Sequence, residues 1–162
     1  MKLCMIGTGY VGLVSGTCFA DIGNQVVCVD KDINKIKKLN SGIIPIYEPG
    51  LEELIKKNSA AKRLSFTTDL RTAISSSNVI FICVGTPTKK GSLNVDLSFV
   101  YKCTKEILKY TNKKKIIVTK STVPVGTGDE IEKIIKKKKK FFTVISNPEF
   151  LREGDAIRDF RY

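Results

Sequence analysis

The sequence predicts an α/β fold in which helices cover both faces of a parallel β-sheet. Short runs of branched apolar residues are apolar at every position, which is typical of strands buried on both faces. Each run is followed by a loop of small residues and then by a stretch with helical spacing. Strand and helix in regular alternation indicate a doubly wound sheet.

The individual elements follow from these patterns. Strands are expected at 3–6, 26–29, 64–67, 79–84, 116–118 and 142–145. Helices are expected at 10–22, 32–39, 51–57, 97–110 and 129–139. No linker and no shift of composition divides the chain, so a single domain over 1–162 is predicted.

Composition excludes several classes of function. The 162 residues contain no His, which removes Ser-His-Asp and Cys-His catalysis and His-ligated zinc, and no metal site is expected. The net charge is +12, from 28 Lys and Arg against 16 Asp and Glu. Basic chains bind nucleic acid when their cations interleave with aromatic residues, but these lysines gather at 35–38, 113–115 and 136–140 without that pattern. We therefore expect solvated lysines and no nucleic-acid partner, with a basic nucleic-acid-binding module as the alternative.

Segment 136–140 is expected to end a helix, where cations oppose the negative end of its dipole, or to fray into a loop. No apolar run approaches the ~18 residues of a membrane span, and no membrane partner is expected. The five cysteines have irregular spacing and form no Cys-x-x-Cys pair, so reduced thiols and a cytoplasmic location are predicted.

A glycine-rich turn follows the first expected strand and opens the first expected helix. Gly7 would make the tight turn, Gly9 would let the backbone approach a pyrophosphate, and Gly12 would permit close packing of helix on sheet. The helix N-terminus would add unpaired amides and partial positive charge. This context predicts a doubly wound, Rossmann-like parallel sheet with helices on both faces, in a single domain that binds a dinucleotide.

Asp30 ends the second expected strand, eighteen residues after Gly12, close to the ~20 expected for the acid that binds a ribose. A carboxylate there accepts from the ribose hydroxyls and repels a 2′-phosphate, which favours NAD over NADP. Lys31 and Lys35 weaken that preference because they tolerate extra negative charge. The alternative is that Asp30 only caps the following helix.

Three later loops, at 84–88, 120–124 and 146–150, follow strands and are expected to converge at one sheet edge. Glu149 and Glu153 are four residues apart, so a helix there would put both carboxylates on one face, where one could act as a general base. From spacing alone, two solvated side chains are the favoured interpretation.

The chain resembles the N-terminal NAD-binding domain of the UDP-glucose 6-dehydrogenases. The matching segments run in order along nearly the whole sequence: 7–13, 28–30, 45–51, 66–70, 84–87, 120–127 and 146–154. The stretches 47–51 and 147–154 are shared with the wider nucleotide-sugar dehydrogenases, while Ile46-Tyr47 and 156–160 favour UDP-glucose.

The resemblance implies oxidation of UDP-glucose to UDP-glucuronate with two NAD, through a thioester on a cysteine. It assigns NAD contacts to Gly7, Thr8, Gly9, Tyr10, Val11, Gly12, Asp30, Lys35, Val84, Gly85, Thr86, Pro87, Thr88, Ser121, Thr122, Val123 and Glu153. Catalytic roles in holding or activating water fall to Thr122, Glu149 and Glu153. The sugar nucleotide would border Glu149, Phe150, Leu151, Arg152 and Glu153.

One departure from the family pattern bears on activity. The family's nucleophilic cysteine, its dimer-forming central helix and most UDP-binding groups come from segments that this sequence lacks, and Cys103 is expected in mid-helix. We therefore expect a domain truncated before the central helix and C-terminal domain, inactive alone and part of a homodimer or higher oligomer when full length. GDP-mannose or UDP-N-acetylmannosamine dehydrogenase domains and a catalytically inactive NAD-binding module are the alternatives.

Overall fold

Six strands form one parallel sheet in the computed structural model, which describes residues 1–89, 91, 94–111, 113–138 and 142–162. The strands are β1 (Lys2–Ile6), β2 (Gln25–Val29), β3 (Leu64–Thr67), β4 (Val79–Ile82), β5 (Ile116–Thr119) and β6 (Thr143–Ser146). Their order is β3-β2-β1-β4-β5-β6, and every neighbouring pair is parallel. This is the strand order of a doubly wound dinucleotide-binding sheet, so the predicted fold class is confirmed.

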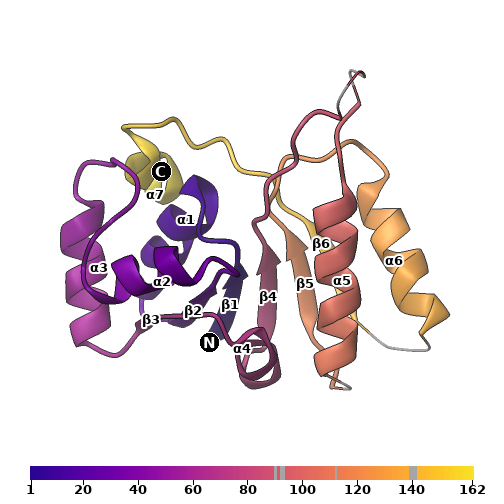
Figure 1. Ribbon diagram of the computed structural model, residues 1–162, viewed down its shortest axis with the longest axis horizontal. Coiled ribbons are helices and arrows are strands. Elements are labelled where there is room, and N and C mark those ends of the chain that lie inside the picture. Colours follow the sequence, from indigo (N-terminus) through magenta and orange to yellow (C-terminus); the bar gives the residue numbers. More distant parts are fainter. Residues whose placement is uncertain (90, 92–93, 112, 139–141) are drawn as a thin grey trace.

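Seven helices accompany the sheet in the described part of the chain (Figure 1). They are α1 (Tyr10–Asp21), α2 (Ile33–Asn40), α3 (Leu51–Ala60), α4 (Leu70–Ser76), α5 (Ser98–Tyr110), α6 (Thr127–Lys137) and α7 (Ala156–Arg161). The sequence prediction missed α4 and α7, which are too short to show a clear apolar period. The Asp69 carboxylate, which accepts from the Thr72 amide and caps α4, was the available signal.

Several predicted boundaries were wrong by a few residues. The strand predicted at 79–84 ends at Ile82, although the Cys83 amide still donates to the Ile6 carbonyl at 2.9 Å. The helix predicted at 129–139 begins at Thr127 and ends at Lys137, with Lys138 as its C-cap. Lys136 and Lys137 therefore lie in its last turn, as one reading of the lysine run expected, while residues 139 and 140 lie outside the described residues.

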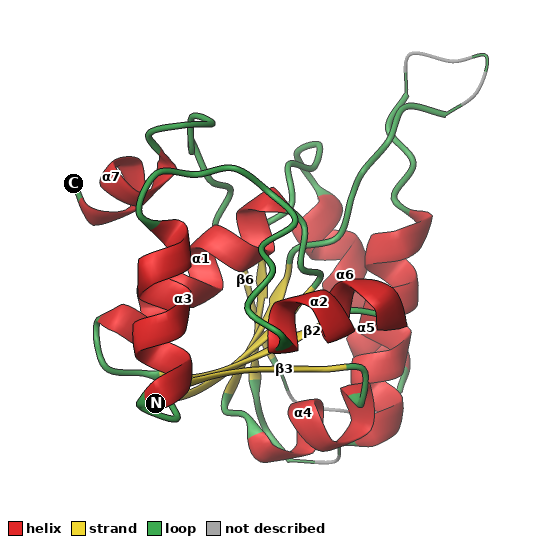
Figure 2. Cartoon of the chain, turned by 60° about the vertical axis from the view of Figure 1, so that its left-hand side comes forward, coloured by secondary structure: helices red, strands yellow, loops and turns green. Residues whose placement is uncertain are grey.

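The central strands β1, β2, β4 and β5 are buried on both faces along most of their length, whereas the edge strand β6 is mostly exposed. Along β1, Leu3 and Met5 pack into the cluster that contains residues of α1, α2, α3 and α7. Cys4 and Ile6 point to the other face and pack with residues of α4, α5 and α6. Alternate side chains of one strand thus serve two cores, which explains why neither set could be polar. Figure 2 shows the sheet between its two helical layers.

The C-terminal segment returns to the start of the chain. α7 lies beside α1 (Figure 1), where the Phe160 ring meets the Phe19 ring edge-on at a centroid distance of 4.9 Å. Arg161 adds an ion pair to Asp21 at 2.9 Å. The chain before α7 passes the start of α1, where Tyr10 forms hydrogen bonds with Arg152 and Gly154, and so lies near the edge of the sheet where the candidate site is found.

All five cysteines are free and buried. Cys103 lies in the middle of α5, as expected. None of the helices in the described part of the chain is long and apolar enough to cross a membrane.

Candidate functional site

The glycine-rich turn occupies the carboxyl end of β1. The Gly7 amide donates to the Val29 carbonyl at 2.7 Å, and Gly7 has a φ of +106° that disfavours any side chain. A Cβ on Gly12 would lie 2.0 Å from the Gly7 carbonyl oxygen, so Gly12 is required for the packing of α1 against the turn. A Cβ on Gly9 would meet nothing within 4 Å. Internal packing therefore explains Gly7 and Gly12 but leaves Gly9 to another cause.

Asp30 is tied to this turn by its carboxylate. One oxygen accepts from the Thr8 amide at 2.9 Å and the Thr8 hydroxyl at 2.8 Å, and it pairs with the Lys35 ammonium at 3.2 Å. The other oxygen accepts from the Asp32 amide. Burial alone would raise the pKa of the Asp30 carboxyl, but these donors hold its pKa below the ordinary value. Asp32, and not Asp30, caps α2 by accepting from the amides of Asn34 and Lys35.

A pocket of about 810 Å³ opens beside the turn and Asp30. It lies where the strand order reverses between β1 and β4, the point at which open α/β sheets bind ligands. Eight of the predicted cofactor contacts line it: Gly7, Gly9, Asp30, Lys35, Val84, Gly85, Thr86 and Pro87. No side chain caps the N-terminus of α1, so amides of its first turn remain available at the mouth of this pocket.

One helix face supplies much of the pocket wall and was missed from the sequence. Phe99, Lys102, Cys103 and Glu106 recur at spacings of three and four along α5, and all four line the pocket. A helix was predicted at 97–110, but no binding role was assigned to this face of it. The Lys31 ammonium lies 5.3 Å from the centroid of the Phe99 ring, which joins the two sides of the pocket.

The loops after β4 and β5 are joined to each other. The Thr86 hydroxyl donates to the Thr122 carbonyl at 3.0 Å, and the Ser121 hydroxyl donates to the Val84 carbonyl at 2.7 Å. The Asn147 amide donates to the Thr119 carbonyl at 3.0 Å and begins the third loop beside them. The three loops lie at the same edge of the sheet. Four predicted cofactor contacts in the loops after β4 and β5 do not line the pocket: Thr88, Ser121, Thr122 and Val123.

The segment at 149–153 is not helical, so the condition under which Glu149 and Glu153 would share one helix face is not met. Pro148 cannot donate to a helix, and the Glu149 carboxylate accepts from the Leu151 amide two residues later, which stabilises a turn instead. Phe150 is 87% exposed. Arg152 pairs with Asp155 at 2.9 Å and Asp159 at 2.6 Å.

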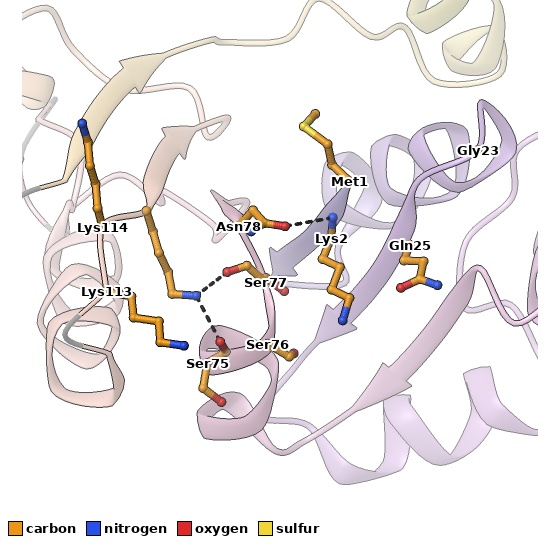
Figure 3. Close-up of a pocket in the computed structure, with 11 residues that line it drawn as sticks. Met1, Lys2, Gly23, Gln25, Ser75, Ser76, Ser77, Asn78, Lys113 and Lys114 are labelled. Carbon is orange, nitrogen blue, oxygen red and sulfur yellow. Dashed lines mark hydrogen bonds between the residues drawn. The ribbon is translucent and has the colours of Figure 1, made fainter.

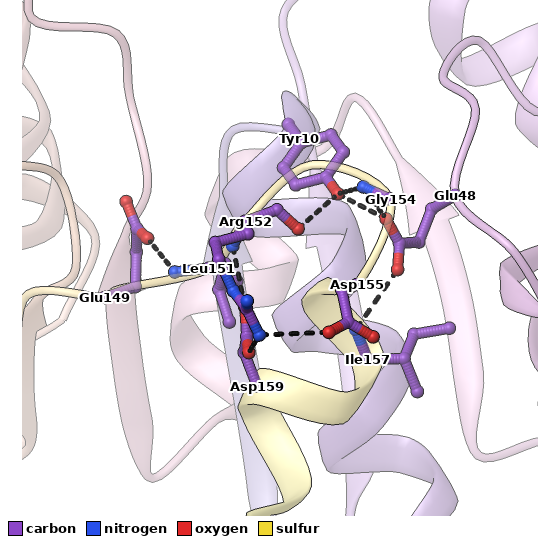
Figure 4. Close-up of polar contacts among 9 residues, drawn as sticks. All are labelled: Tyr10, Glu48, Glu149, Leu151, Arg152, Gly154, Asp155, Ile157 and Asp159. Carbon is purple, nitrogen blue, oxygen red and sulfur yellow. Dashed lines mark hydrogen bonds and ion pairs between the residues drawn. The ribbon is translucent and has the colours of Figure 1, made fainter.

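Glu48 fastens this segment to the glycine-rich turn (Figure 4). Its buried carboxylate accepts from the Tyr10 hydroxyl, from the Gly154 amide at 2.8 Å and from the Ile157 amide at 3.2 Å. Burial alone would raise the pKa of Glu48, but these donors hold it below its ordinary value. Burial and the bond to Glu48 raise the pKa of Tyr10 to about 12. The 47–51 stretch carried a resemblance in the sequence, but it gave Glu48 no role.

Lys120 is a second buried charge at this edge of the sheet. It follows β5 and is only 6% exposed, and its ammonium interacts electrostatically with Cys83 and Glu149. Burial lowers its pKa. The Lys120 ammonium thus links the end of β5 to the third loop through its electrostatic interaction with Glu149.

A dinucleotide fits the arrangement around the pocket. Gly9 leaves open space next to uncapped helix amides, as a pyrophosphate requires, and Asp30 presents an ionised carboxylate at the end of β2. The fold and the pocket together define a dinucleotide-binding domain of the dehydrogenase type.

The chain belongs to the UDP-glucose/GDP-mannose dehydrogenase family: that family's NAD binding domain matches residues 1–162. It is 58% identical to a UDP-glucose 6-dehydrogenase of Rhizobium meliloti over 99% of this chain and 37% of the relative. It is 55% identical to the UDP-glucose 6-dehydrogenase TuaD of Bacillus subtilis over 98% of this chain and 35% of the relative.

A solved structure gives the same fold. A ternary complex of GDP-mannose dehydrogenase from Pseudomonas aeruginosa superposes with a TM-score of 0.93 at 38% identity, over 100% of this chain and 39% of that one. The chain thus spans little more than a third of the length of the relatives that it matches.

Proposed function

We propose that this chain is the NAD-binding part of a UDP-glucose 6-dehydrogenase, which oxidises the C6 alcohol of UDP-glucose to the carboxylate of UDP-glucuronate. The observation that carries the proposal is the pocket at the β1–β4 switch point, with Gly9 and Asp30 on its wall, in a chain that matches the family over its whole length. The names of the relatives at 58% and 55% identity favour UDP-glucose as the substrate.

The cofactor half of the site would act through the turn and Asp30. The amides that open α1 would hold the pyrophosphate, while Asp30, fixed by Thr8 and Lys35, would accept from the ribose hydroxyls. An ionised Asp30 would repel a 2′-phosphate, so NAD is preferred to NADP. The loops of Thr86 and Ser121, joined to each other, would border the reactive end of the cofactor. When bound, NAD supplies the hydride acceptor.

The substrate half would act through the third loop. Thr122 and Glu149 would position the water that completes oxidation to the acid, and the Glu149 carboxylate, which interacts with the Lys120 ammonium, would accept a proton from it. Glu153 is exposed next to the Tyr10–Glu48 pair, where it would border both cofactor and sugar nucleotide. Phe150 and Arg152 would border the sugar nucleotide as well.

Activity would require more than this chain. The proposed reaction passes through a cysteine thioester, whereas Cys4, Cys83 and Cys103 are buried with pKa values raised by that burial. We propose that the nucleophile and the dimer interface belong to a further segment, and that this chain alone is inactive. The five reduced thiols support a cytoplasmic location.

Isothermal titration of the chain with NAD and with NADP tests the cofactor assignment. Binding of NAD that is at least about tenfold tighter than binding of NADP is expected, because of the Asp30 charge. Absence of heat with both cofactors would remove the proposal.

A second assay addresses the substrate. NADH formation is followed with UDP-glucose, GDP-mannose and UDP-N-acetylmannosamine, first with this chain and then with a longer enzyme that carries it as its N-terminal domain. We expect no turnover by the chain alone and preference for UDP-glucose by the longer enzyme. Preference for GDP-mannose, which the close structural match makes the second candidate, would replace the substrate assignment.

A further inference from the structure

A second pocket lies at the opposite edge of the sheet from the cofactor site. Its volume is about 650 Å³, within the usual range of small-molecule sites, and it is formed where β1, β2, β4 and β5 begin. Its wall consists of Met1, Lys2, Gly23, Gln25, Ser75, Ser76, Ser77, Asn78, Lys113, Lys114 and Lys115 (Figure 3).

The charge of this pocket is one-sided. Four of its lining residues are lysines, and none of the described residues on its wall carries a carboxylate. The ion pairs found in the described part of the chain use none of these four lysines. Elsewhere on the surface lysines do find acids, as in the pairs Lys56–Glu52 and Lys133–Glu130.

Lys115 makes this pocket different from a solvated lysine face. It is only 5% exposed, and its ammonium donates to the main-chain carbonyls of Ser75, at 3.1 Å, and Ser77. These carbonyl dipoles orient the ammonium at the end of α4, but they carry no net charge to neutralise it. Buried charges are normally paired, so a buried ammonium next to further cations leaves a demand for an anion. Burial, with the nearby charge of Lys113, lowers the pKa of Lys115.

Two of the exposed lysines, Lys2 and Lys113, point toward the same serines in Figure 3, while Lys114 points away from them. In the view of Figure 3, Ser76 lies between the ammonium groups of Lys113 and Lys2. The Ser75, Ser76 and Ser77 hydroxyls donate to carbonyls of α4, so donors for a ligand would come chiefly from the lysines. Lysine ammonium groups are compact charges that suit phosphate oxygens.

We propose that this pocket binds a small anion that carries a phosphate or diphosphate group, held by Lys2 and Lys113 next to the buried charge of Lys115. A nucleic-acid strand is the less suitable ligand, because the described wall of the pocket offers no aromatic side chain on which a base could stack. The site is separate from the cofactor pocket, since the two share no lining residue.

Pyrophosphate is the appropriate probe, observed by amide chemical shifts of the labelled chain. Because the turn at residues 7–12 also offers amides to a diphosphate, the titration is run with and without saturating NAD. Saturable shifts at Lys2, residues 75–78 and residues 113–115 in both titrations are expected. Shifts confined to residues 7–12, or none at all, would overturn the proposal. Inorganic phosphate is titrated in parallel to separate a monophosphate from a diphosphate preference.

Two variants with equal charge complete the test. Lys2→Gln with Lys113→Gln should weaken pyrophosphate binding at this pocket at least about tenfold, because two charged donors are lost. Lys37→Gln with Lys38→Gln removes the same charge from exposed positions on α2 and should change binding less than about twofold.

Equal losses in both variants would show attraction to net charge alone and would overturn the site. Tighter binding of a single-stranded oligonucleotide than of pyrophosphate would overturn the choice of ligand. Lys113→Gln alone serves as a milder variant, and tags belong at the C-terminus because Met1 lines the pocket.

Discussion

The carboxyl edge of the sheet has two halves that are built differently. The half around the glycine-rich turn and Asp30 is proposed to bind the cofactor, and the half around Glu149 is proposed to border the substrate. Around Asp30, every described hydrogen bond of the carboxylate comes from a neighbouring residue of the same half, and the side chain is 12% exposed. Around Glu149, the one hydrogen bond described for the carboxylate comes from its own turn, and Phe150 beside it is exposed. The cofactor half is therefore organised by this chain, while the substrate half offers surface still open to other groups.

The difference shows where the two halves depend on each other. Glu48 and Tyr10 join the segment at 152–157 to the turn of the cofactor half, so one buried carboxylate sets the position of the loop that follows β6. Substitutions in the glycine-rich turn, at Asp30 and at Glu48 should therefore affect the two halves to different extents.

The largest effect is expected at Gly12. Gly12→Ala would place a Cβ 2.0 Å from the Gly7 carbonyl oxygen and should lower the free energy of unfolding by about 3–5 kcal/mol, because main-chain atoms must move. Gly9→Ala is the matched control, because its Cβ would meet nothing within 4 Å and Gly9 has an ordinary φ of −71°. Urea unfolding should show near-normal stability for Gly9→Ala, while calorimetry should show weaker NAD binding. Equal stability of the two variants would contradict this geometry.

The next effect concerns the cofactor half alone. Asp30→Ala should weaken NAD binding by about 2–3 kcal/mol, since it removes a charged acceptor for the ribose, and should reduce the preference over NADP. Asp32→Ala is the control, because Asp32 caps α2 without lining the pocket. Titration calorimetry measures both. Unchanged NAD affinity in Asp30→Ala would mean that Asp30 does not bind the ribose. Loss of hydrogen-exchange protection at residues 149–157 in this variant would contradict the expectation that Asp30 acts in the cofactor half alone.

The smallest of the three effects tests the link between the halves. Glu48→Gln should destabilise the docking of α7 by about 1–2 kcal/mol, because charge-assisted bonds to Tyr10, Gly154 and Ile157 are weakened. Hydrogen exchange at the Gly154 and Ile157 amides is the measurement, and Tyr10→Phe should show a lesser increase in exchange.

The hydrogen-exchange protection of the segment that Glu48 binds should also depend on pH. Because the pKa of Glu48 is lower in the folded chain, its contribution is complete above its ordinary value of 4.5 and is lost as pH falls through the folded pKa. The wild-type chain should therefore lose protection at Gly154 on acidification, while Glu48→Gln should show a flatter profile. Parallel profiles would exclude Glu48 as the cause.

The sequence predicted the fold well because the central strands β1, β2, β4 and β5 are buried on both faces along most of their length. Residues such as Cys4, Met5 and Ile80 leave no polar position in their strands, so the pattern is hard to mistake. The turn at Gly7 and Gly12 was equally predictable, since a Cβ at either position would clash with main-chain atoms of this chain.

The site was predictable only where contacts are local in sequence. Asp30 reaches Thr8 through adjacent strands, whose order the fold class already implies. Glu48 reaches Gly154 across most of the chain, and no spacing encodes such a contact. The spacing of Glu149 and Glu153 could not decide whether a helix forms there, and the structure has a turn in which the Glu149 carboxylate accepts from the Leu151 amide.

The return of α7 to α1 also has a consequence during synthesis. Phe19 emerges from the ribosome early, but its ring partner Phe160 emerges only after most of the domain has been made. At about 5–20 residues per second, the interval is roughly 7–30 s. Until α7 appears, Phe19 can pack on Phe81 but not on Phe160, so the nascent chain is most prone to misassembly at α1 before α7 has been made.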